Sequence, residues 1–154
     1  MKKVITITFL IPVLVLLGTG ETSPGRFPVV DLISIESEAL QVPVELVCAV
    51  ILTESSGNPL AKSKANCRGL MQVSEEVWNI FMKGKSWQLA YDPDENVRCG
   101  IRYMGDLYKM YASWEKVLRH YHSGNPNSKR AVTNRYVKKV LERTAMIKRR
   151  QQMG

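Results

Sequence analysis

VELVCAVILTESSGNP, residues 44–59, is an apolar run that ends in a carboxylate. Three apolar residues precede Glu54 at helical spacing, and they are Val47, Val50 and Ile51. They share one helix face with Glu54, because side chains three, four and seven positions apart lie on the same side of an α-helix. Gly57 can adopt a positive φ and Pro59 cannot continue a helix, so the helix should end at about Glu54. The stretch therefore predicts a buried helix, from Pro43 at its first position to about residue 54, whose core-facing stripe ends in an acid.

Glu54 is the first candidate for a catalytic group. Apolar neighbours disfavour a charged carboxylate, and the negative end of a helix dipole repels an anion, so both effects should raise its pKa. A carboxyl group that keeps its proton near neutral pH is suited to general acid catalysis. The alternative from these residues alone is a solvated glutamate at an exposed helix end.

The rest of the chain predicts further helices and no strands. A helix over about 29–40 comes first, and Ser74 should cap another that reaches about Met82. Asp92-Pro93 should open a helix with an amphipathic stripe, and Ser113 one that ends at Ser123-Gly124. The last helix is expected to turn these residues inward: Val137, Val140, Leu141 and Thr144. We therefore expect one all-α domain of about six helices over 29–150, with the polar loop of residues 60–68 at the rim of a cleft.

The N-terminus has the pattern of a secretory signal peptide. Lys2 and Lys3 are followed by an apolar run over residues 4–17 and by small residues before Glu21. We expect a signal peptide over 1–20 and a linker over 21–28, so that the protein works in the periplasm, the cell envelope or outside the cell. An uncleaved N-terminal anchor is the alternative.

The chain is basic, with a formal net charge of +8, and much of the excess lies after Ser128. An exported basic helix suits contact with an anionic envelope, although a solvated helix face explains the same residues. The basic segment lacks the interleaved aromatic residues of a nucleic-acid binder, so we expect no nucleic-acid partner.

The three cysteines give an odd number for an oxidising compartment. Cys48 lies inside the apolar helix and should be a core residue, whereas Cys67 and Cys99 could form a disulfide. Neither the cysteines nor His120 and His122 have the spacing of a zinc site, so we expect no metal and no cofactor.

Five short motifs occur in order along the chain: ESSGNP at 54–59, GLMQ at 69–72, DP at 92–93, NVRCGIRY at 96–103 and YHSG at 121–124. Together they resemble the soluble lytic transglycosylase domain, which has a lysozyme-like fold shared with goose-type lysozymes. The resemblance runs from about residue 29 to 140. It implies an enzyme that acts on peptidoglycan glycan strands, and it favours a small exported type associated with secretion or conjugation machinery.

Residue by residue, the resemblance makes Glu54 the single catalytic acid and base. It implies substrate contacts for Ser55 beside it, for Gln72, for Met71 as a wall of the cleft, and for Tyr121 as an aromatic hydroxyl near the scissile bond. From the residues alone, Met71 and Tyr121 could equally be core side chains.

Three further residues, Asn96, Gly100 and Tyr103, look structural and should let a helix pack closely behind the site. The chain departs from the family where Ala-Tyr-Asn is often found, because it has His120-Tyr121-His122 there. We expect no role for His122, which should be a polar loop residue near the cleft.

A single carboxylate favours one reaction. Hydrolytic glycosidases generally need two carboxyl groups, and the other acids, at 75–76 and 92–95, are better explained as helix caps and dipole partners. The resemblance then implies a lyase that cleaves the MurNAc–GlcNAc β-1,4 bond and leaves a 1,6-anhydro end. A goose-type lysozyme hydrolase and a non-catalytic cell-wall binding or assembly protein are the alternatives.

Overall fold

A computed structural model describes residues 29–153, so the predicted signal peptide (1–20) and linker (21–28) lie outside the described part. The described residues form six α-helices and a 3-10 helix, η2: α2 (Val29–Leu40), α3 (Val44–Glu54), α4 (Glu75–Phe81), η2 (Trp87–Tyr91), α5 (Pro93–Tyr111), α6 (Trp114–Ser123) and α7 (Ala131–Met153). The all-α prediction is confirmed, and η2 was not predicted. Between residues 29 and 153, the β pairing is limited to two isolated bridges in the loop before α4, Lys62 with Arg68 and Arg68 with Val73.

The predicted helix starts are confirmed by their capping bonds. Ser74 accepts from the Val77 N–H at the start of α4. Asp92 accepts from two N–H groups of the first turn of α5, and Ser113 caps α6. One detail differs, because Pro43 precedes α3 as its N-cap residue and is not its first helical residue.

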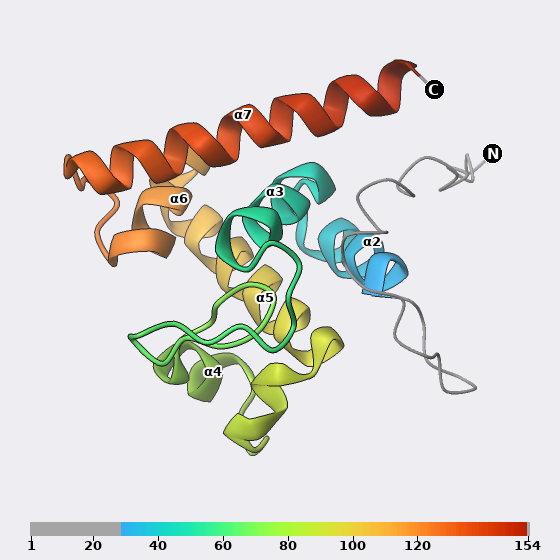
Figure 1. Cartoon of the computed structure of the whole chain (residues 1–154), viewed down its shortest axis with the longest axis vertical. Helices are drawn as coiled ribbons and strands as arrows, with labels where there is room; N and C mark the ends of the chain where they lie inside the picture. The colour runs from blue at the N-terminus through green and yellow to red at the C-terminus, as the bar shows by residue number, and fades with distance from the viewer. Residues whose placement is uncertain (1–28, 154) are drawn as a thin grey trace.

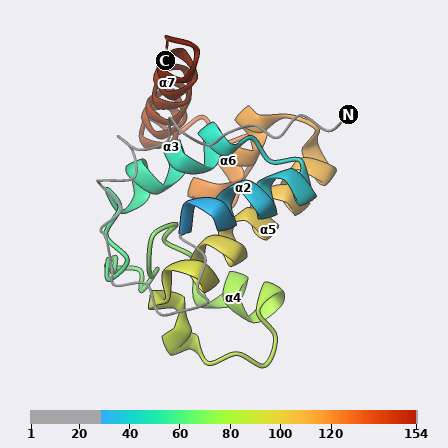
Figure 2. The same ribbon diagram turned by 90° about the vertical axis from the view of Figure 1, so that its right-hand side faces the viewer.

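Helix α3 forms the centre of the molecule. Every residue from Leu46 to Ile51 is buried, so the helix is covered on all sides and not along a single stripe. The long helix α7 packs along one side of α3, and α2 packs against another (Figure 1). Helix α2 also packs on α5, which runs on to α6 (Figure 2). The ends of α3 are therefore set by contacts with several elements at once.

Helix α7 turns a different set of residues inward from the set expected. Leu141 is 40% exposed, which corrects its predicted burial, and Thr144 is half-buried. The inward face is formed by Thr133, Tyr136, Val137, Val140 and Ile147. Leu141 follows Val140 by about 100° around the helix, so the two cannot both lie at the centre of one narrow contact face.

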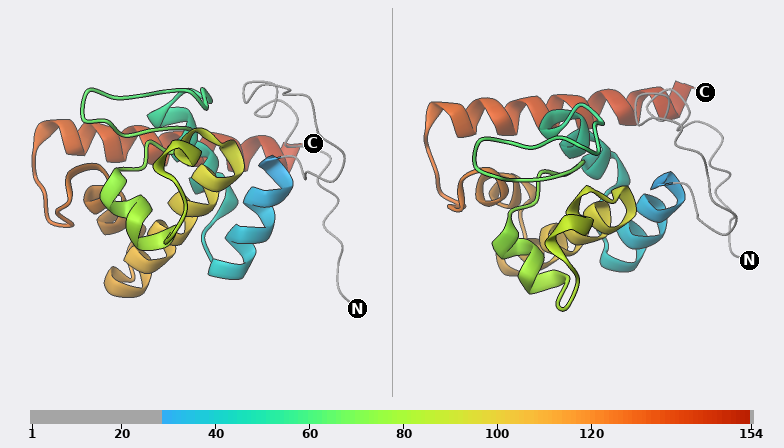
Figure 3. Two further views of the ribbon diagram at one scale, coloured as in Figure 1. Left: turned by 90° about the horizontal axis from the view of Figure 1, so that it is seen from below. Right: turned by 60° about the horizontal axis from the view of Figure 1, so that its bottom comes forward.

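Asn96 attaches the loop between α3 and α4 to α5. It is fully buried, its side-chain oxygen accepts from the Met71 N–H at 2.8 Å, and its amide nitrogen donates to the carbonyls of Arg68 at 2.8 Å and Ala90 at 2.7 Å. Gly69 (φ +77°) lies so close that a Cβ there would be 2.2 Å from the Asn96 amide nitrogen. After α3, the loop extends outward and then turns back to reach α4 (Figure 3). The structural role predicted for Asn96 is confirmed.

The three cysteines are free thiols in this structure, so the predicted bridge between Cys67 and Cys99 is not formed in it. Cys99 is fully buried in α5, and this burial raises the pKa of its thiol to about 12. Because the thiolate is the reactive form, a buried Cys99 is poorly prepared for disulfide exchange.

None of the helices in residues 29–153 combines the length and the apolar character that a membrane span requires.

Replacing Asn96 by Ala should lower the free energy of unfolding by roughly 3 kcal/mol, because the Met71 N–H and the Ala90 carbonyl lose their Asn96 partner, while the Arg68 carbonyl keeps the Val73 N–H. Urea denaturation followed by circular dichroism measures this loss. Asn127→Ala, at an exposed asparagine, is the control and should stay close to the wild type. A loss below about 1 kcal/mol for Asn96→Ala would contradict the anchoring role.

Candidate active site

Glu54 is the last residue of α3, and its carboxyl group lies between α3 and α7. The side chain is mostly buried, and the hydroxyl of Tyr136 donates a hydrogen bond to its Oε1 at 2.7 Å. Burial raises the pKa of Glu54 from 4.5 to about 7, and the Tyr136 hydrogen bond opposes this rise. Glu54 therefore exchanges its proton near neutral pH, as the sequence predicted. A carboxyl group of this kind can act as an acid in one step and as a base in the next.

Tyr136 is the functional residue that the sequence analysis missed. It lies 82 residues after Glu54, on the buried face of α7, and is 8% exposed. Burial and then the charge of Glu54 keep the pKa of its hydroxyl well above the usual value, so Tyr136 stays a donor to the carboxylate. Its position four residues before Val140 could have indicated that Tyr136 faces the core, because the sequence analysis already placed Val140 there and the two share a helix face.

Ser55 fixes the start of the loop that follows Glu54. Its hydroxyl donates to the Leu70 carbonyl at 2.7 Å and accepts from the Gly57 N–H at 3.2 Å. The side chain predicted to contact substrate therefore joins the two ends of the loop directly beside the acid.

Met71 does not form the wall of the cleft that the sequence predicted. Its side chain is fully buried and packs on Gly100 of α5, where a Cβ would come within 2.4 Å of the Met71 sulfur. The close approach predicted at Gly100 is thus confirmed, and it is Met71 that fills the space.

Gln72 has a left-handed backbone, with φ 47°, and its amide nitrogen donates to the carbonyls of Ala61 and Gly69, both at 3.0 Å. It is partly exposed and borders a hollow of about 200 Å³. The hollow is lined by Cys67, Gln72, Val73, Ser74, Val77, Tyr103, His120, Tyr121 and Gly124. Of the predicted substrate contacts, the structure thus places Gln72 and Tyr121 at one hollow.

Tyr121 connects this hollow with Glu54. Its hydroxyl donates to the Met71 carbonyl at 2.8 Å, and its ring lies 5.3 Å from that of Tyr103, centroid to centroid. Burial, followed by the nearby Glu54, raises the pKa of its hydroxyl well above the ordinary value. The side chain predicted to lie near the scissile bond is therefore close enough to Glu54 to respond to its charge, and its hydroxyl supports the GLMQ backbone.

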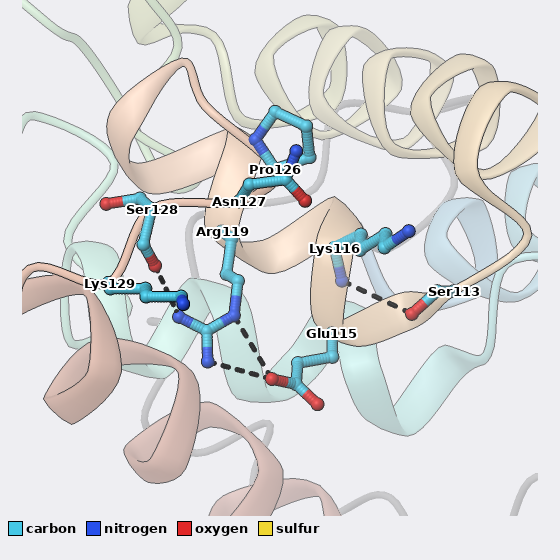
Figure 4. A pocket seen from close by; sticks show the side chains of 8 residues that line it. All are labelled: Ser113, Glu115, Lys116, Arg119, Pro126, Asn127, Ser128 and Lys129. Carbon is cyan, nitrogen blue, oxygen red and sulfur yellow. Dashed lines mark hydrogen bonds and ion pairs between the residues drawn. The ribbon is translucent and has the colours of Figure 1, made fainter.

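A second hollow, of about 300 Å³, lies where α6 begins and the chain turns towards α7 (Figure 4). Its residues are Ser113, Glu115, Lys116, Arg119, Pro126, Asn127, Ser128 and Lys129. Arg119 is bonded to Glu115 at 2.8 Å and to the Ser128 carbonyl at 2.6 Å, and it also reaches Asn134 of α7. The hollow shares no residue with the surroundings of Glu54 described above, and Arg119 within it is already bonded to groups of α6, α7 and the turn between them, so we regard it as the joint between α6 and α7.

In the part of the chain that the structure describes, no group of three or more His, Cys, Asp or Glu side chains is arranged to hold a metal ion.

Residues 31–143 match the transglycosylase SLT domain. The chain is 37% identical over 90 residues to the membrane-bound lytic murein transglycosylase E of Buchnera aphidicola, a stretch that covers 54% of this chain and 41% of that protein. It is 35% identical over 101 residues to the membrane-bound lytic murein transglycosylase C of Pectobacterium atrosepticum, covering 61% of this chain and 26% of that one. The chain thus matches less than half of the length of these relatives.

Among solved structures, the 70-kDa soluble lytic transglycosylase of Escherichia coli superposes with a TM-score of 0.68 at 23% sequence identity, over 80% of this chain and 24% of the other. This match confirms the predicted lysozyme-like fold.

The raised pKa of Glu54 should make the wild type less stable as pH rises. Between pH 4.5 and about 7, the folded chain holds a proton that the unfolded chain has released, so the free energy of unfolding falls through this window. Glu54→Gln removes this dependence and should be more stable than the wild type by roughly 3 kcal/mol at pH 8, with little difference at pH 4.

Urea denaturation of both proteins at the two pH values measures the gap. Glu38→Gln, at an exposed glutamate of α2, is the matched control, and its difference in stability from the wild type should not increase between pH 4 and pH 8. Equal stabilities of Glu54→Gln and the wild type at pH 8 would contradict the buried, proton-holding state of Glu54.

Proposed function

The chain belongs to the family of transglycosylase SLT domains, and from this membership we propose that it is a peptidoglycan lytic transglycosylase. The proposed reaction cleaves the β-1,4 bond between MurNAc and GlcNAc and leaves a 1,6-anhydro-MurNAc end. The observation that carries the proposal is the carboxyl group of Glu54, with a pKa raised to about 7 and one bonded donor, Tyr136.

In the proposed first step, Glu54 protonates the oxygen of the leaving GlcNAc as the bond from this oxygen to C1 of MurNAc breaks. An oxocarbenium-like centre develops at C1. The proton that Glu54 holds at neutral pH is the one transferred, and the Tyr136 hydroxyl stabilises the carboxylate left behind by a charge-assisted hydrogen bond.

In the second step, the Glu54 carboxylate takes the proton of the muramyl C6 hydroxyl while this oxygen attacks C1. The new C6–O–C1 bond closes the 1,6-anhydro ring, and Glu54 is protonated again, so no water is consumed. The same group serves as acid and then as base, which requires a pKa close to the working pH.

The positions of the other acids support a lyase over a goose-type hydrolase. Asp92 caps α5 through the N–H groups of Asp94 and Glu95. Glu95 pairs with Lys85 at 2.6 Å, and the acids at 75 and 76 are exposed in the first turn of α4. Asp92 and Glu95 are thus engaged at the start of α5, and the acids at 75 and 76 are exposed at the start of α4, so none of these four is a ready partner to activate water.

We further propose that the sugar next to the scissile bond lies along the hollow bordered by Gln72 and Tyr121. Tyr121 lines this hollow and is close enough to Glu54 for the charge of the carboxylate to raise the pKa of its hydroxyl, which supports the placement. In this placement, the Ser55 side chain and the Met71 carbonyl hold the loop through hydrogen bonds. Neither the Ser55 nor the Met71 side chain touches the sugar.

The site of action that we propose is the cell envelope, after export. The relatives compared above are named as membrane-bound enzymes of murein. The exposed side of α7 carries basic residues, including Lys138, Lys139 and Arg150, and suits contact with an anionic envelope. An association with a secretion or conjugation machine rests on the sequence resemblance.

Digestion of purified peptidoglycan tests the reaction. The protein should release muropeptides that are one water lighter at the muramyl end, as measured by mass spectrometry, and Glu54→Gln should release at least about a thousandfold less. Reducing muramyl ends would show a hydrolase instead. Binding without release by the wild type would support a non-catalytic cell-wall protein.

The pH dependence of kcat/KM tests the role of the proton. Activity should fall as pH rises through about 7, because the free enzyme then loses the proton of Glu54. Tyr136→Phe removes the hydrogen bond that lowers this pKa, so its descending limb should move to higher pH even though its maximal rate falls. A limb that stays in place or moves to lower pH in Tyr136→Phe would contradict this assignment.

A further inference from the structure

His122 of α6 lies against the ring of Tyr136. The ring centroids are 4.5 Å apart and the planes are tilted by 32°, so the two flat rings are in direct contact. This corrects the sequence expectation of a loop residue, since His122 belongs to α6 and is partly buried. The ring that donates to Glu54 is therefore in direct contact with a histidine from a neighbouring helix.

The orientation of His122 is set by a short polar chain. Its Nδ1 lies 3.4 Å from the Thr133 Oγ1, and the hydroxyl of Ser128 donates to the same oxygen at 3.3 Å. Thr133 is fully buried and precedes Tyr136 by three residues on α7, so both side chains project on the same side of that helix. One turn of α7 thus holds the imidazole at one end and presents the phenol ring to it at the other.

We propose that His122 is a positioning residue: it holds the ring of Tyr136 in the orientation that directs the hydroxyl at Glu54. The catalytic consequence rests on the function proposed above, whereas the effect on the titration of Glu54 does not. This role accounts for the departure of the chain from the common Ala-Tyr-Asn pattern, because an imidazole offers a flat ring for stacking as well as a nitrogen for Thr133.

The other groups near Glu54 and His122 have different partners, so the contact between the two rings is what orients Tyr136. Tyr121 also lies near Glu54, but its hydroxyl is bonded to the Met71 carbonyl. Arg143 of α7 reaches Thr53 and not the carboxyl group. Burial, with a smaller effect of Arg130, lowers the pKa of His122, so its ring is neutral at neutral pH and acts by packing.

The titration of Glu54 tests the proposal without any need for activity. With glutamate labelled by ¹³C at the carboxyl carbon, NMR follows the Glu54 signal against pH in the wild type, His122→Ala, Tyr136→Phe and the double variant. Tyr136→Phe should raise the pKa of Glu54 by roughly one pH unit, and His122→Ala by roughly half as much. In the Tyr136→Phe background, His122→Ala should add nothing, because it acts through the hydroxyl that is already gone.

Two further substitutions separate ring packing from loss of stability. His122→Phe keeps a flat ring and should leave the Glu54 titration close to that of the wild type, while His122→Leu fills the space without a ring and should behave like His122→Ala. His120→Ala is the control for the titration, since His120 contacts the Tyr111 hydroxyl at 2.7 Å and not Tyr136.

The proposal is overturned if His122→Ala and His122→Leu lower the melting temperature but leave the Glu54 titration in place, or if the effect of His122→Ala is undiminished in Tyr136→Phe. If the proposed transglycosylase reaction is also observed, His122→Ala should lower kcat several-fold with KM little changed. A wild type that is inactive on peptidoglycan would refute the proposed function and leave the titration result standing.

Discussion

Helix α3 must be covered on every side, and this requirement organises the rest of the molecule. Six consecutive residues, 46–51, are buried, so no face of the helix is left for solvent. Such a helix is stable only when other elements surround it, because its apolar surface would otherwise stay in water. Helices α7 and α2 pack directly on it, and α5 packs on α2.

Enclosing α3 also encloses the acid at its end. Glu54 is raised to a pKa of about 7 mainly because the packing that protects the apolar residues removes water from its carboxyl group. The charged form keeps one strong donor, Tyr136. A site of this kind reduces stability at neutral pH and supplies a proton there, so the same burial that costs folding energy gives the acid its chemistry.

The loop beyond Glu54 is held by polar side chains, and two of them, Ser55 and Tyr121, were expected from the sequence motifs to contact substrate. Ser55 bonds the Leu70 carbonyl, Tyr121 bonds the Met71 carbonyl, and Asn96 bonds three backbone groups of the loop and η2. Because a buried backbone group without a partner is costly, these bonds define one conformation for residues 68–73. The GLMQ segment thus has a fixed backbone conformation, and this conformation shapes the hollow beside Gln72.

The sequence by itself determined the helices, their caps and the acid. Capping residues and apolar spacing act within a few residues of the chain, and for this reason Ser74, Asp92, Ser113 and the buried stripe before Glu54 could be predicted. Only the tertiary structure decided that Met71 turns into the core, that Leu141 faces outward, that Tyr136 bonds Glu54 and that His122 contacts Tyr136. The burial of Met71 depends on how the loop lies on α5, and the other outcomes depend on how α7 packs on α3 and α6 on α7. Local periodicity carries no information on which side chain of one helix meets a residue 82 positions away on another.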